Sequence, residues 1–247
     1  MTSVNKINEV ISTLRGEPAS TIESYSRVLR REGLLPETRR GGGATPIGSF
    51  HMATMLMAVM RGSPTRAAEN AREVGELIVH DGGGLQAPIL ASQLAVMGWQ
   101  ENTSFAEAVA SFIDRYADGT INDFTGGQPI EIKVQRYWPS ASISWVPTGV
   151  MLEALVRSHT EVYGADAAAR VLVLGVDGKA YHRMKISFES PLRYEQIVSY
   201  RDGDNERNEV AHRKYQEMAE EAKKYDVRGS EGITSKTLIA LAKLLKP

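Results

Sequence analysis

The spacing of apolar residues changes once along this chain, near residue 120, and this change restricts the folds that the chain can adopt. Before that point apolar side chains recur every three or four positions, as in Ile7, Val10 and Leu14, which is the spacing of one helix face. From Ile130 the segment IEIKVQRY alternates apolar and polar residues, which is the period of a half-buried strand. Helices followed by strands predict an α+β fold with an antiparallel sheet.

The second part of the chain carries signals for two β-hairpins. ASISWV from Ala141 repeats the alternation after Pro139, and Asp177-Gly178 separates RVLVLGV from KAYHRMKISF, a strong hairpin signal. Apolar residues between the hairpins, from Met151 to Val156, have helical spacing. Further helices are expected over 205–225 and 235–245, and the last of them could be a swapped dimer arm or a lid on its own domain.

Residues 1–118 are expected to be wholly helical. A helix over 5–14 precedes one for which Ser20 is the predicted N-cap, in a capping box with Glu23, and which Gly33 closes. Its predicted inner face consists of Ile22, Tyr25 and Leu29.

Three more helices follow in this first part. They are expected over 49–61, from Ser63-Pro64 to about Val79, and after a second capping box formed by Ser104 and Glu107. The remaining bulky residues are predicted to be core or interface residues: Met52, Met55, Met57, Met60, Trp99, Trp138 and Trp145.

Composition excludes several classes of function. Cys is absent from the 247 residues, which removes disulfides, thiol nucleophiles and thiolate metal sites. The chain has 29 Lys and Arg against 30 Asp and Glu, so a polyanion could be bound only through a local basic surface. We expect a cytoplasmic protein with no membrane segment, because no long apolar run is present.

Two short helices joined by a tight turn, with arginines on the outer face of the second, are typical of a helix-turn-helix DNA reader. Arg can pair bidentately with guanine, Ser and Thr are adaptable, and Glu can accept a hydrogen bond from cytosine. The outward residues of the second helix are Ser20, Thr21, Glu23, Ser24 and Arg27. Arg30 and Arg31 are expected to contact phosphate, and Arg39 and Arg40, before Gly41–Gly43, are expected to form a basic wing or to enter the minor groove.

The segment INEVISTLRGEPASTIESYSRVLRREGLLP resembles the helix-turn-helix of bacterial and phage transcription regulators, in which the recognition helix ends in a pattern carried here by Leu29, Arg30, Gly33 and Leu34. The basic glycine-rich loop and the alanine-rich helices after it are similar to small regulators encoded by prophages of alphaproteobacteria. The resemblance covers about the first 80 residues. It implies a regulator that binds double-stranded DNA without catalysing a reaction.

The expected organisation is a DNA-binding domain over 1–80, a helical connector over 81–120, and an α+β domain over 121–247 for dimerisation or binding of another protein. The same reader would also suit a phage DNA-packaging or replication-initiation factor. An alternative of another class is an enzyme or ligand-binding protein with its site in the α+β part, recognisable by a deep pocket of convergent polar groups. We expect no cofactor and no metal, because the five His are scattered and the glycine runs lack phosphate-loop spacing.

Overall fold

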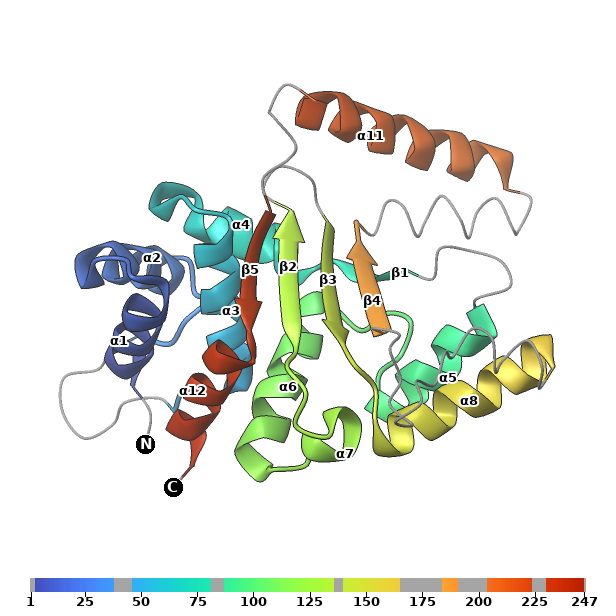
Figure 1. The fold of residues 1–247 in the computed structure, drawn as a ribbon. Coiled ribbons are helices and arrows are strands. Elements are labelled where there is room, and N and C mark those ends of the chain that lie inside the picture. The colour runs from blue at the N-terminus through green and yellow to red at the C-terminus, as the bar shows by residue number, and fades with distance from the viewer. Residues whose placement is uncertain are drawn as a thin grey trace.

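Helices surround one antiparallel sheet in the computed structural model, which describes residues 3–37, 46–80, 87–135, 140–164, 184–190, 204–223 and 230–246 (Figure 1). The helices are α1 (Val4–Arg15), α2 (Ala19–Arg31), α3 (Ser49–Met60), the short 3-10 helix η1 (Pro64–Arg66), α4 (Ala67–Gly75), α5 (Ala87–Met97), α6 (Phe105–Asp118), α7 (Asn122–Thr125), α8 (Gly149–Tyr163), α11 (Asn205–Lys223) and α12 (Ser235–Leu245). The strands are β1 (Ile78–His80), β2 (Glu131–Gln135), β3 (Ser140–Trp145), β4 (Met184–Glu189) and β5 (Ser230–Thr234). The predicted α+β class is confirmed.

The strands form a five-stranded sheet in the order β1-β4-β3-β2-β5, and each neighbouring pair is antiparallel. The predicted pairing of the two alternating segments is confirmed, with Ile132 opposite Ile143. The hairpin predicted at Asp177-Gly178 lies outside the described residues, although β4 contains the end of its second segment.

The prediction that residues 1–118 are wholly helical was wrong at one place among the residues that the structure describes in this range. Ile78–His80 forms the edge strand β1, which pairs with β4, a strand more than a hundred residues later in the sequence. The helix predicted to run from Ser63-Pro64 to Val79 is accordingly shorter, because η1 and α4 end at Gly75 and the next residues extend into the sheet. Three residues are too few to show an alternating pattern, so local sequence carries no signal for this strand.

One face of the sheet is buried under α6. Cross-strand partners place apolar side chains on this face in rows, such as Ile233, Ile132, Ile143 and Ile186. Aromatic rings from α6 meet it at 5.0 Å (Phe105 with Phe188) and 5.4 Å (Phe112 with Trp145), in edge-on geometry. The alternation seen in β2 thus reflects a sheet with one covered face.

The last helix packs on its own chain. Leu238, Leu241 and Ala242 of α12 are buried, and the helix lies against α6 and α1. Both roles named for this helix, a swapped dimer arm and a lid on its own domain, stay predictions. The four methionines of α3, with Trp99 and Trp145, are also buried as predicted, whereas Trp138 lies outside the described residues.

A single cluster of buried apolar residues extends from Val4 to Ala242 and so includes residues on both sides of the predicted boundaries at 80 and 120. The division into three parts stays a prediction.

Across the described ranges, no helix is both long enough and apolar enough to cross a membrane.

Two adjacent glycines after α7 offer a test of the packing between α7 and the start of α8. Gly126 and Gly127 both have positive φ, 53° and 79°. A Cβ on Gly126 would lie 2.6 Å from Oγ1 and 3.1 Å from Cβ of Thr148, whereas the nearest atom to one on Gly127 is at 3.9 Å. We expect Gly127→Ala to lower the free energy of unfolding by about 1 to 2 kcal/mol through its backbone alone. Gly126→Ala should cost about 1 to 3 kcal/mol more through overpacking. Equal losses in urea denaturation of the two variants would contradict the tight contact with Thr148.

Candidate nucleic-acid interface

Helices α1 and α2 form a pair joined by Gly16, Glu17 and Pro18. Gly16 has φ 67°, the left-handed conformation that ends α1. Inside the pair, the amide of Asn8 donates a hydrogen bond of 3.0 Å to Oγ of Ser26, and both residues are buried. Because this buried hydrogen bond forms in one register only, it restricts how α2 lies on α1.

The predicted capping box of α2 was wrong. The helix begins at Ala19, and its N-cap is Pro18, two residues before Ser20, without a side-chain hydrogen bond. The carbonyl of Pro18 accepts from the backbone N–H groups of Thr21 and Ile22, so Ser20 lies within the first turn. Glu23 instead forms an ion pair with Arg27, four residues on.

The predicted end of α2 agrees with the structure. Gly33 follows the helix with φ 73°, and the backbone N–H of Leu34 donates to the carbonyl of Leu29 at 2.8 Å. Together with the bond from Gly33 N–H to Arg30 O at 3.0 Å, this is a Schellman motif. The Leu-Arg-x-x-Gly-Leu pattern therefore has a local physical role, whatever α2 binds.

Most of the predicted reader residues lie on the solvent side of α2. Ser20, Glu23, Arg27 and Arg31 are exposed, while Thr21, Ser24 and Arg30 are partly buried. The opposite face is in the core, as predicted, with Ile22 and Leu29 fully buried and Tyr25 at 3% exposure. Arg39, Arg40 and the glycines after them lie outside the described residues.

The arginines of α2 make weak local contacts. Arg27 pairs with Glu23 at 3.3 Å and Arg31 with Glu32 at 3.2 Å, and both arginine side chains are 71% exposed. Nε of Arg30 donates to the carbonyl of Ser26 at 3.3 Å. Exposed ion pairs contribute little to stability, so Arg27 and Arg31 can leave these partners for a ligand at small cost.

Two further arginines lie beside α2 and were not among the predicted residues. The elements η1 and α4, which carry Arg66 and Arg72, both pack against α2. The guanidinium of Arg72 donates to the carbonyl of Glu32, after the end of α2, at 3.4 Å. Arg66 makes two hydrogen bonds of 2.6 Å to Glu69, and these lower the pKa of that carboxyl. Nothing in the local sequence marks them, because only tertiary packing brings them to α2.

The charge of this surface is mixed. Residues 19–33 contain three Arg and two Glu, and residues 61–76 contain three Arg and three Glu, which gives 6 − 5 = +1 in total. A field this weak provides little attraction for phosphate at a distance. Any polyanion must therefore be held by contacts at particular positions.

Helix α3 begins directly after the basic loop and carries a histidine in its first turn. Nδ1 of His51 accepts a hydrogen bond of 3.2 Å from the backbone N–H of Gly48. Burial lowers the pKa of His51 below its usual value. This geometry gives His51 a capping role, and no group of three or more His, Cys, Asp or Glu that could hold a metal occurs in the part of the chain that the structure describes.

No protein-family model, no curated protein and no solved structure matches this chain. Function must therefore be argued from the geometry of the site.

The cap made by His51 has a pH dependence that can be measured. Because the pKa of His51 is lowered in the folded state, its contribution to stability is complete above the ordinary value of 6.5 and is lost as the pH falls below it. We expect His51→Gln, which keeps an acceptor but does not titrate, to lose less stability than the parent between about pH 7 and pH 5. The measurement is the midpoint of urea unfolding across that range. Parallel curves for the two proteins would show that His51 is not the titrating group.

Proposed function

We propose that this protein is a sequence-specific DNA-binding regulator that reads the major groove with α2. The observation that carries the proposal is the single exposed row Ser20, Glu23, Arg27 and Arg31 on a helix that is locked to α1 through its opposite face. A helix-turn-helix reader also consists of two packed helices joined by a short turn, and the pairing of α1 with α2 supports the proposal in this respect. The resemblance of this segment to phage and bacterial regulators supports the same reading.

In the proposed complex, the first turns of α2 meet base edges and its end meets the backbone. Arg27 would pair with guanine and Glu23 would accept from cytosine, once their mutual ion pair of 3.3 Å has opened. Arg31 at the end of α2, and Arg72 of α4, whose guanidinium reaches the carbonyl of Glu32, would contact phosphates and fix the register. Arg39 and Arg40 would extend the same contacts along the flanking DNA.

The proposal includes a homodimer, because one copy of α2 reads only a few base pairs. The outer strand β5 pairs with a single neighbour among the described strands, so its other edge could pair with a second copy. Regulation would follow from occupancy of a promoter.

The direct test is selection from random duplex DNA by the purified protein, with the mass of the complex measured on the same sample. The expected result is an inverted repeat with half-sites about 34 Å apart, bound by a dimer. Because the charge of the interface is nearly balanced, affinity for random DNA should be low. Strong binding without sequence preference would contradict the proposal, as would no enrichment at low salt.

Substitutions separate base reading from phosphate contact. Arg27→Ala should cost about 1 to 3 kcal/mol on the selected site and relax the preference at one base. Arg31→Ala and Arg72→Ala should weaken binding to all sequences alike. Each should also reduce the salt slope, which is the slope of log affinity against log salt concentration, by about 1.

The matched control for these variants is Arg157→Ala, which removes an exposed arginine of α8. It should leave both the affinity and the salt slope unchanged. If Arg27→Ala behaves like this control on the selected site, the assignment of α2 as the reader is wrong.

A further inference from the structure

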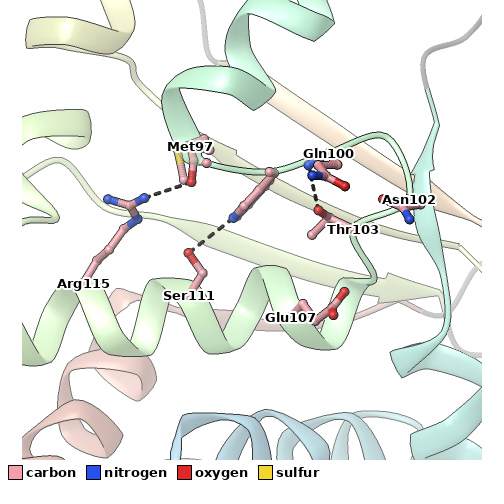
Figure 2. A pocket seen from close by; sticks show the side chains of 9 residues that line it. Met97, Gln100, Asn102, Thr103, Glu107, Ser111 and Arg115 are labelled. Carbon is pink, nitrogen blue, oxygen red and sulfur yellow. Dashed lines mark hydrogen bonds between the residues drawn. The ribbon is translucent and has the colours of Figure 1, made fainter.

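A polar hollow of about 530 Å³ lies where α5 turns into α6 (Figure 2). One wall is a face of α6, where Glu107, Ser111 and Arg115 follow one another at intervals of four residues. Four residues of helix rise about 6 Å, so an acid, a hydroxyl and a guanidinium are spread over about 12 Å. The opposite wall is the segment 97–103, with Gln100, Asn102 and Thr103.

The hollow is held in shape by its own hydrogen bonds. Nε1 of Trp99 donates to Oγ of Ser111 at 3.3 Å, and the backbone N–H of Gln100 donates to Oγ1 of Thr103 at 2.8 Å. The carboxylate of Glu107 accepts from both the backbone and the hydroxyl of Ser104. The walls are therefore formed before any ligand binds, which is the usual state of small-molecule sites.

Arg115 lies at one end of this hollow without a carboxylate partner among the described residues. Its guanidinium donates to the carbonyl of Met97, the last residue of α5, at 2.8 Å and lies 4.2 Å from the centre of the Phe124 ring. Its Nε is buried and has no partner, and no carboxylate of the described residues lies within ion-pair distance of it. Burial lowers the pKa of Arg115, although an arginine stays charged at neutral pH.

We propose that the hollow binds a small organic anion, a hydroxycarboxylate with a single negative charge, whose carboxylate is held by Arg115. A guanidinium without a carboxylate partner suits this group, because its N–H groups match the two oxygens. The amides and hydroxyls of Gln100, Asn102 and Thr103 suit the hydroxyls of such a ligand. Asp118 and Asp123 lie near enough to Arg115 to act on its charge, and they disfavour an anion with two charges such as phosphate.

Calorimetric titration of the full chain with gluconate tests this proposal. Gluconate carries one carboxylate and several hydroxyls, glucose serves as the neutral control, and inorganic phosphate as the competing anion. Gluconate is expected to bind and glucose to give no heat. Arg115→Gln should weaken gluconate by about tenfold or more, whereas Arg157→Gln, on α8, should leave it unchanged.

A second variant keeps the test decisive if Arg115→Gln does not fold, since Arg115 also caps α5. Gln100 is exposed at the rim, and Gln100→Ala should leave the fold intact while weakening gluconate by about two- to fivefold. Equal heats from gluconate and glucose, tighter binding of phosphate, or unchanged gluconate affinity in both variants would overturn the proposal. None of these outcomes depends on DNA binding.

Discussion

The contact between α6 and the sheet is the interaction on which the rest of the structure depends. Phe105 and Phe112 of α6 pack edge-on against Phe188 and Trp145, and all four side chains are fully buried. The other faces of α6 meet α3 and α12, so one helix joins the N-terminal helices, the sheet and the C-terminus. Large aromatic side chains provide both the buried area and the directional contacts that such a central helix needs.

The two candidate sites depend on this helix in different ways. Helix α6 packs against α3, and α3 packs against α2. The position of α2 is therefore set by core packing rather than by its exposed side chains. The polar hollow is built on α6 directly, which contributes Glu107, Ser111 and Arg115 to its lining. The structure thus separates an exposed row of side chains suited to a large partner from a hollow suited to a small one.

Electrostatics explain why neither site is evident from charge counts. The arginines of α2, η1 and α4 are interleaved with glutamates, which keeps the folded surface nearly neutral. Arginines in exposed ion pairs of this kind can easily exchange their partners for others. The ion pair of Arg61 with Glu73 differs, because its arginine side chain is only 9% exposed, and it holds α4 to α3. Burial therefore distinguishes Arg61, which supports the fold, from the exposed Arg27 and Arg31 of α2.

The sequence by itself determined the elements whose signals are local. The inner face of α2, its end at Gly33, the capping box at Ser104 and the alternation of β2 and β3 all depend on residues within a few positions of one another, and they agree with the structure. The predicted start of α2 was wrong. Ser20 and Glu23 match the sequence pattern of a capping box, but the helix already begins after Pro18, which is its N-cap. The strand β1, the approach of Arg72 to α2 and the hollow beside Arg115 were decided only by tertiary structure. Each requires side chains or strands that meet through long-range packing, which no local pattern encodes.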